Sequence, residues 1–186
     1  MEVIVRLAEA SGAVVQSHPV NKQVVIRARY PESPWNWDIV DPDKGININQ
    51  VRNQSTQNRS LPMYDFVLVS GEAEGVSDII QRTGSGGEVR LPMVVDSLIL
   101  THPASQERGR NLLSNRGEQS LETLTLQLSP AATAPGRVLP LELVGVDEGG
   151  GSWLGLSLST SITASMDESR TLEVWMSNTL ERHFNE

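Results

Sequence analysis

The sequence contains no cysteine, and this absence excludes several kinds of chemistry. A disulfide framework, a thiol nucleophile and a thiolate metal site all require that residue. The fold must therefore be held together by side-chain packing. With 38% hydrophobic residues in a chain of 186, there is enough apolar material to bury a core.

Long apolar runs are also missing. No segment approaches the roughly 18 apolar residues that a membrane span needs. The N-terminal stretch MEVIVRLAEASG lacks the basic flank and the small-residue cleavage site of a signal peptide. These features predict a globular protein that is made and kept in a cytoplasm and has no membrane partner.

Lysine is scarce, because Lys22 and Lys44 stand against thirteen arginines. The net charge is -8 and the pI is about 4.9. Since proteins bind phosphates mainly through Lys and Arg, this balance predicts no stable nucleic-acid binding. Arginine pairs well with carboxylates at buried or interfacial positions, so its excess fits salt bridges or subunit contacts. The codon usage of a GC-rich genome explains the excess equally well.

The first sixty residues predict a small α+β domain. Apolar residues at helical spacing from Val3 to Ala8 predict a short helix that stops at Gly12. The β-branched runs AVVQSH and QVVIRARY, separated by a turn, predict a hairpin across residues 13–30. Residues 48–62 are rich in Asn, Gln and Ser and predict an exposed edge strand or a linker. We place a domain boundary there, which gives domains over residues 1–62 and 63–186.

The second domain is predicted to be mostly β. Seven runs carry the prediction: YDFVLVSGE, GVSDIIQRT, VDSLILT, SLETLTLQLS, VLPLELVGVDE, SWLGLSLSTSITAS and RTLEVWMSNTLERH. Alternating apolar and polar residues with Gly, Pro, Asp and Ser at the breaks indicate an antiparallel barrel or sandwich. The predicted fold class is therefore α+β, mainly β: a small N-terminal helix-plus-hairpin domain followed by an antiparallel β-barrel with one embedded helix.

That helix is predicted near residues 103–116, with Thr101 or His102 as its cap and Pro103 in its first turn. Gly109 in its middle costs about 1 kcal/mol relative to Ala, so another segment should pack closely against that face. We assign SLIL, just before the helix, to the sheet. The stretch RLPMVVDSLILTHPASQERGRNLL is then a structural joint rather than a catalytic site. Three arginines of this region are expected to be solvated or ion-paired: Arg108, Arg110 and Arg116.

No candidate metal or phosphate site emerges from the residue spacing. The three histidines, His18, His102 and His183, form no HxxxH or HxH pair. A D-x-x-D-x-D cluster resembles a calcium loop but lacks its closing Glu, and predicts a solvated turn: Asp38, Asp41 and Asp43. The glycine-rich residues 82–89, RTGSGGEV, lack the Lys-Ser or Lys-Thr of a P-loop and predict a flexible hairpin tip. DEGGGSW, residues 147–153, predicts a turn between two strands.

No catalytic or cofactor-binding set emerges either, because no serine sits in a G-x-S-x-G elbow. We therefore predict no catalytic, cofactor-binding or metal-ligating residues, no cofactor and no enzymatic activity.

The order of the segments resembles one protein family. Three stretches carry the resemblance: RLAEASGAVVQSHPVNKQVVIRARYPESPWNW, YDFVLVSGEAEGVSDIIQRTGSGGEVRLPMVVDSLILTHPASQERGRNLLS and LELVGVDEGGGSWLGLSLSTSITAS. Over residues 5–175 or so, they look like the central and C-terminal parts of bacteriophage tail hub proteins, the baseplate hubs of contractile-tailed and Mu-like phages and prophages. The second stretch has most of the matching features, including L-P-M-V and a helix containing E-R-G-R.

The resemblance implies a structural protein of the virion tail that is made in the cytoplasm of a host bacterium. Such a hub is a trimeric ring that joins the tail tube to the central spike and leaves an axial channel for DNA. Hub chains usually carry two related β-barrels. This chain has about half the usual length, so we expect that an N-terminal barrel is missing.

Two alternatives belong to other functional classes. A tail-associated cell-wall hydrolase would need two carboxylates about 5–10 Å apart beside a cleft. The only cluster to nominate is Glu72, Glu74 and Asp78. A module that binds host glycans would use exposed tryptophans as stacking platforms, namely Trp35, Trp37 or Trp153. Trp35 and Trp37 are two positions apart, which in an extended segment puts both rings on one side, and burial at a core edge is the favoured use of such rings.

Overall fold

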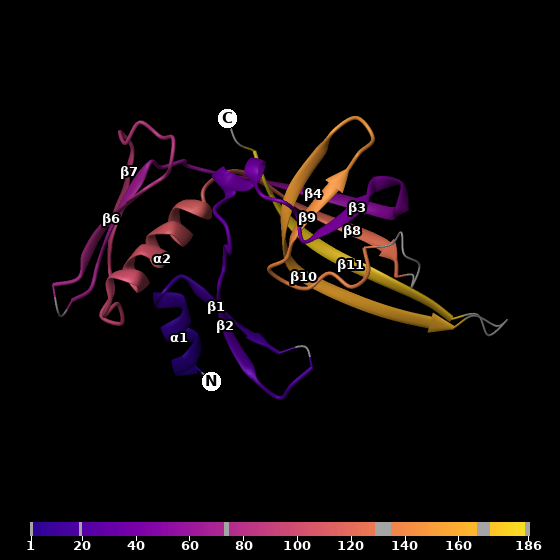
Figure 1. The fold of residues 1–186 in the computed structure, drawn as a ribbon, viewed down its shortest axis with the longest axis horizontal. Coiled ribbons are helices and arrows are strands. Elements are labelled where there is room, and N and C mark those ends of the chain that lie inside the picture. The colour runs from indigo at the N-terminus through magenta and orange to yellow at the C-terminus, as the bar shows by residue number, and fades with distance from the viewer. Residues whose placement is uncertain (1, 19, 73–74, 129–134, 167–171, 185–186) are drawn as a thin grey trace. The chain divides into compact units, whose positions relative to one another are not determined.

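The structure is a computed structural model that describes residues 2–18, 20–72, 75–128, 135–166 and 172–184 (Figure 1). It is mainly β, with 50% strand and 18% helix, which confirms the predicted α+β class. No helix in these residues is long and apolar enough to cross a membrane. The elements in chain order are α1 (Glu2–Ala10), β1 (Ala13–Ser17), β2 (Val24–Ala28), η1 (Pro34–Ile39), β3 (Lys44–Asn47), η2 (Ile48–Gln50), β4 (Val51–Leu61), β5 (Phe66–Ser70), β6 (Ser77–Gln81), β7 (Arg90–Val95), α2 (His102–Ser114), β8 (Gly117–Gln127), β9 (Leu143–Asp147), β10 (Ser152–Met166) and β11 (Leu172–His183).

The chain folds into two compact units, and each unit is built from two separate segments. Unit 1 comprises Met1–Asn36 and Leu61–Gly117, and unit 2 comprises Trp37–Ser60 and Glu118–Glu186. The predicted boundary at residue 62 coincides with one crossing between the units, but the chain crosses twice more, after Asn36 and after Gly117. That residues 1–62 and 63–186 form separate domains stays a prediction.

Unit 1 begins with the predicted helix and hairpin. In α1 the alanines Ala8 and Ala10 are buried, and the helix ends at a turn in which Gly12 adopts a φ of +69°. Strands β1 and β2 pair antiparallel from Ala13↔Ala28 to Ser17↔Val24. The helix-plus-hairpin prediction is therefore confirmed.

The rest of unit 1 is a three-stranded sheet in the order β6-β5-β7. The central strand β5 pairs antiparallel with β6 and parallel with β7. The glycine-rich residues 82–89 therefore cross from one edge of the sheet to the other, and the predicted hairpin tip is wrong. Strands β6 and β7 are consecutive in sequence, but β5 lies between them in the sheet, and no local signal indicates this order.

SLIL is not a strand, contrary to the prediction. The strand lies earlier, in β7, and Asp96 then begins a turn by accepting a 2.9 Å hydrogen bond from the N–H group of Leu98. Aspartate favours such turns because its side chain replaces a backbone acceptor. Ile99 nevertheless joins the core of unit 1, where its side chain is fully buried together with Val67, Val69 and Leu113.

Helix α2 is where the sequence predicts it, one or two residues earlier at each end. The side chain of Thr101 caps it by accepting from the N–H group of Ala104, and Pro103 follows in the first turn. The helix packs on β5 and β6. A methyl group on Gly109 would lie 2.6 Å from Cδ1 of Ile80, which confirms the expected close packing at that glycine. The helix belongs to unit 1 and is not embedded in the C-terminal sheet.

The side of α2 that faces away from the sheet contacts the N-terminal segment of unit 1. Arg108 donates to the carbonyl of Glu9 at 2.8 Å, and Asn111 donates to the carbonyl of Gly12 at 3.0 Å. Arg110 donates to the carbonyl of Tyr30 at 3.1 Å and pairs with Glu107. Helix α2 therefore covers the sheet of unit 1 on one side and contacts the N-terminal segment on the other.

The loop after β6 gives a prediction on pH. The carboxylate of Asp65 accepts hydrogen bonds from the N–H groups of Val89 and Glu88. These bonds, with that of Val89 contributing most, hold the pKa of Asp65 below its ordinary value of 3.8. A lowered pKa in the folded state stabilises the fold above the unfolded-state pKa, and this stability is lost as the pH falls through the folded-state pKa. We expect Asp65→Asn to lower the urea midpoint at neutral pH, and the gap to the parent protein to close below about pH 4. Asp41→Asn, at an exposed aspartate of unit 2, is the control; equal pH profiles for the two variants would contradict the assignment.

Unit 2 is a six-stranded sheet in the order β3-β9-β10-β11-β8-β4. The inner pairs are antiparallel, whereas β3 lies parallel to β9 at one edge. Strand β4 forms the other edge, and its side chains from Arg52 to Ser60 are exposed, which confirms the predicted edge strand. Edge strands resist unwanted pairing when they carry charged and polar side chains.

The predicted closed barrel is wrong, because the described sheets are not closed. Strands β3 and β4 lie at opposite edges, yet only the three residues of η2 join them. Three residues span at most about 11 Å, so the sheet must curl strongly enough to bring one corner of each edge together.

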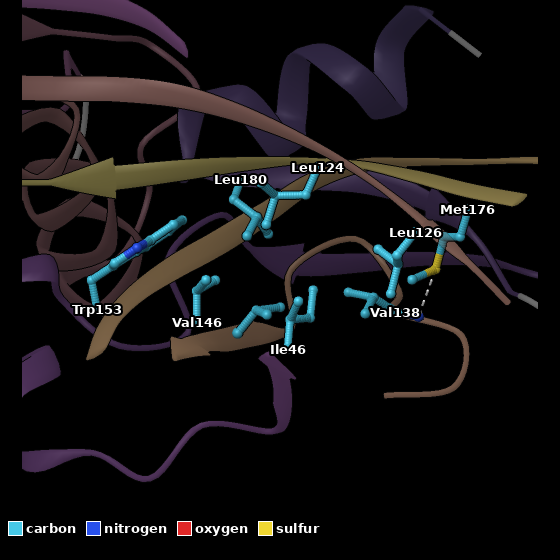
Figure 2. Close-up of a cluster of buried hydrophobic side chains, with 9 residues drawn as sticks. Ile46, Leu124, Leu126, Val138, Val146, Trp153, Met176 and Leu180 are labelled. Carbon is cyan, nitrogen blue, oxygen red and sulfur yellow. Dashed lines mark hydrogen bonds between the residues drawn. The ribbon is translucent and has the colours of Figure 1, made fainter. Parts of the chain in front are cut away.

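The concave side of this sheet carries the core of unit 2 (Figure 2). Nine buried residues form it: Ile46, Leu124, Leu126, Val138, Val144, Val146, Trp153, Met176 and Leu180. Figure 2 shows these side chains converging from several strands, with Trp153 at one end. The sulfur of Met176 accepts from the N–H group of Val138 at 3.5 Å.

The buried side-chain amide of Asn178 stabilises the pairing of β10 with β11. The pairing of β10 with β11 shifts by one residue between Ser157 and Ser159. Opposite the shift, the amide nitrogen of the fully buried Asn178 donates to the hydroxyls of Ser157 and Thr160 at 2.9 and 2.7 Å. Because the two hydroxyls lie on either side of the bulge, Asn178 stabilises one register there.

Candidate functional site

A cleft with a volume of about 890 Å³ lies in unit 2. It lies beside the parallel pair β3 and β9, at the start of β10 and the end of β11. Its lining combines aromatic, polar and small residues: Trp37, Asp38, Val40, Pro42, Gly45, Ile46, Asn47, Gln50, Gly145, Val146, Asp147, Ser152, Trp153, Leu154, Arg182, His183 and Phe184. A cleft of this size and mixed lining is typical of sites for small organic ligands.

The guanidinium of Arg182 lies over two aromatic rings of this cleft. Its central carbon lies 4.7 Å from the ring centroid of Trp153 and 4.8 Å from that of Phe184. Within the residues that the structure describes, the side chain of Arg182 makes no hydrogen bond and no ion pair. Its N–H donors are therefore available at the cleft.

The indole of Trp153 is itself held in place. Its Nε1–H donates to a carboxylate oxygen of Glu148 at 2.8 Å, and the residue is 8% exposed. Glu148 and Trp153 bracket the turn between β9 and β10, where the N–H group of Glu148 donates to the carbonyl of Gly151. The predicted turn at 147–153 is thus confirmed, and it also orients a cleft wall.

Another wall is built on a buried pair. His183 Nε2 lies 2.8 Å from Oε1 of Glu181, and both side chains are almost fully buried. The ring of Trp37 meets the ring of His183 edge to face, with centroids 5.2 Å apart. Trp37 is therefore fixed and only 4% exposed.

The cleft also offers acceptors. Asp147 and Asn47 are exposed and lie opposite each other in the register of β3 with β9. Oδ1 of Asp147 accepts from the N–H group of Gly149 at 2.8 Å, and Oδ2 accepts from the Asn47 amide at 3.4 Å. A carboxylate has about four acceptor positions, so Asp147 keeps capacity for a ligand. Asp38, also exposed, adds a second carboxylate to the lining.

The predicted tryptophan pair is separated by the fold. Trp35 and Trp37 lie in the helical turn η1 rather than in an extended segment, because Pro34 fixes a φ that suits a first helical position. Trp35 packs at the core of unit 1, whereas Trp37 belongs to unit 2. Trp37 and Trp153 are buried rather than exposed, which agrees with the favoured use of these rings.

His18 and His102 each contact residues of unit 1. His18 accepts from the N–H groups of Val20 and Asn21 in a turn, and His102 Nδ1 lies 3.0 Å from Asp78. No group of three or more His, Asp or Glu that could hold a metal ion occurs among the described residues.

Of the carboxylates nominated for a hydrolase, the two described ones are not assembled into a site, and the aspartates of the predicted solvated turn are exposed. Glu72 is exposed, Asp78 pairs with His102, and Glu74 lies outside the described residues. In the other cluster, Asp43 ties the start of β3 to β9, because its carboxylate accepts from the N–H group of Leu143 at 2.8 Å.

Sequence reasoning missed Arg182 and Phe184. Their signal is the alternation of Leu180, Arg182 and Phe184, since residues two apart in a strand face the same side. Leu180 lies in the core, so Arg182 continues the same face to the cleft.

The fold of a helix, a hairpin and a small sheet in one unit and an open six-stranded sheet in the other is one that solved tail proteins share. One is the tail protein from Neisseria meningitidis MC58, with a TM-score of 0.56, 10% sequence identity, and coverage of 97% of this chain and 53% of that chain. Another is the 43 kDa tail protein of prophage MuSo2 from Shewanella oneidensis, with a TM-score of 0.52, 15% identity, and coverage of 97% and 54%. The chain spans about half the length of these proteins. No family model matches the sequence, and no curated protein matches it.

Proposed function

We propose that this chain is a structural component of a phage or prophage tail and acts in the virion tail. The observation that carries the proposal is the extent of the shared fold, which includes both units and covers 97% of the chain in each of two solved tail proteins. The segment-by-segment resemblance of the sequence to tail hub proteins is a separate line of support.

Within the tail, we propose that the chain contributes to a hub ring. Three copies would join the tail tube to the central spike around an axial channel for DNA. The charge distribution supports this role. Unit 1 has 9 Lys and Arg against 10 Asp and Glu, and unit 2 has 6 against 13, so the net charges are -1 and -7. An acidic channel lining does not hold the phosphates that must pass it.

We propose further that the chain has no enzymatic activity. Support comes from the nominated carboxylates, since Asp78 is engaged by His102 and Glu72 is an exposed residue after β5. No contact in the described residues favours the hydrolase alternative.

The experiment is light scattering behind a sizing column over a concentration series, followed by a gel-shift assay with duplex DNA at about 0.1 M salt, where charges still act over roughly 10 Å. We expect a trimer that does not retard the DNA. A protein that stays monomeric at the highest concentration would overturn the ring as a property of this chain. Retardation of the DNA would overturn the channel role. Solubilisation of a cell-wall suspension that is abolished by Glu72→Gln would overturn the structural assignment.

A further inference from the structure

The cleft of unit 2 contains Arg182, whose guanidinium contacts two aromatic rings but has no hydrogen-bond or ion-pair partner among the described residues. We propose that this cleft is a binding site for a sugar acid, meaning a monosaccharide unit that carries a carboxylate, with the carboxylate on Arg182 and the hydroxyls on Asp147 and Asn47. The inference does not depend on the proposed tail function.

The first step concerns Arg182. A guanidinium is planar and presents its donors in a fixed fork that matches a carboxylate with two parallel hydrogen bonds. Contact with the rings of Trp153 and Phe184, whose centroids lie 4.7 and 4.8 Å from the guanidinium carbon, restricts the positions that this fork can adopt. An arginine that is already oriented loses less rotamer freedom on binding than a freely moving one.

The second step concerns the rigidity of the walls. Trp153 is fixed by its 2.8 Å hydrogen bond to Glu148, and Trp37 is fixed by its contact with the ring of His183. Phe184 is anchored by the hydrogen bond from its own N–H group to the carbonyl of Glu118, yet its side chain stays 39% exposed. The cleft therefore presents one open aromatic surface beside the guanidinium, against which an apolar ring face can pack.

The third step selects the ligand class by charge. Asp38 and Asp147 line the same cleft, and unit 2 has a net charge of -7. A phosphate or a run of acidic residues would meet this negative field with two or more charges, whereas a single carboxylate meets it with one. Hydroxyl groups donate as well as accept, so they can use the acceptors that the carboxylates supply. One carboxylate among several hydroxyls fits this combination best.

The fourth step concerns size. A volume of about 890 Å³ lies in the usual range for small-molecule clefts and is larger than one sugar unit needs. The site can thus receive a sugar acid as part of a short glycan as well as alone.

The test is isothermal titration calorimetry of the full chain with sodium D-glucuronate, D-glucose and sodium acetate as probes. Glucose keeps the hydroxyls without the carboxylate, and acetate keeps the carboxylate without the ring. We expect saturable binding of glucuronate, at least tenfold tighter than that of either control. Equal affinity for glucuronate and acetate, or for glucuronate and glucose, would overturn the proposal, and so would tighter binding of a tetraglutamate peptide.

A matched pair of variants assigns the site. Arg182 and Arg52 both stack on a tryptophan at 4.7 Å in unit 2, but Arg52 lies over Trp175 in β11 and is not part of the cleft lining. We expect Arg182→Lys, which keeps the charge and loses the fork, to weaken glucuronate binding at least tenfold, and Arg52→Lys to change it less than twofold. If Arg182→Lys fails to fold, Phe184→Leu replaces it, with an expected loss of at least fivefold. Equal effects of the cleft variant and of Arg52→Lys would place the sugar elsewhere and overturn the proposal.

Discussion

Replacing Leu180 by alanine is expected to lower the free energy of unfolding of unit 2 by about 2–5 kcal/mol. Leu180 is fully buried in the core on the concave side of the six-stranded sheet, beside Leu124 and Trp153. The variant removes three carbon atoms and leaves a cavity that the paired strands β8, β10 and β11 cannot collapse to fill. Urea unfolding followed by tryptophan fluorescence measures the change.

The matched control is Leu172→Ala, eight residues earlier in the same strand. Leu172 is 64% exposed, so the same truncation removes little buried surface. We expect a change within about 0.5 kcal/mol of zero. Equal losses in the two variants would mean that the apolar face at the far end of β11 is buried in solution.

Replacing Gly12 by alanine is expected to cost about 2–4 kcal/mol through two effects. The residue adopts a φ of +69°, which side chains disfavour. A methyl group there would also lie 2.7 Å from the carbonyl oxygen of Glu107 and 2.9 Å from Cβ of Asn111, both in α2. The helix would have to move away from the turn, which breaks the hydrogen bond from Asn111 to the Gly12 carbonyl. Hydrogen exchange of the amides of α1 and α2 measures the loss.

Gly149→Ala separates the two effects. Gly149 has a φ of +76° but nothing lies within 4 Å of the added methyl group. We expect this variant to cost only the backbone term, about 1–2 kcal/mol. If Gly12→Ala is no more harmful than Gly149→Ala, the packing of the turn against α2 is looser than the structure indicates.

Local signals in the sequence were sufficient for the elements that local chemistry determines. The cap at Thr101 and the proline at 103 located the start of α2 within one residue. Alternation located β8, β10 and β11, and in β8 and β11 buried and half-buried positions alternate over the part that faces the core. Polar composition predicted an exposed edge strand or a linker at residues 48–62, and β4 forms the edge strand there.

The errors concern contacts between residues far apart in sequence. SLIL has a strand-like composition, but Asp96 starts a turn there, and β7 begins before it. The parallel pairing of β5 with β7, across the glycine-rich residues 82–89, has no local signal. The open sheet differs from the predicted barrel because of where β3 and β4 pair, and strand order cannot be derived from alternation alone.

The candidate site was hidden for the same reason. Asn47, Asp147 and Arg182 come from three strands, and the nearest two in sequence are 35 residues apart. Trp37 and Trp153 were singled out for their size, but nothing near Arg182 in the sequence indicates the stacking on Trp153. Only the pairing of β9 and β11 with β10 brings these side chains to one cleft.

The strand order of unit 2 has a consequence for the way the protein is made. The last strand in the sequence, β11, lies inside the sheet, between β10 and β8. A chain emerging from the ribosome therefore holds two half-sheets, β3-β9-β10 and β8-β4, with no strand to connect them until residues 172–183 arrive. Because most pairing in this unit is long-range, its folding waits until β11 has been synthesised and should be slow. Until then the edges of β8 and β10 are open to other nascent chains, so this sheet is the part of the molecule with the greatest need of a chaperone.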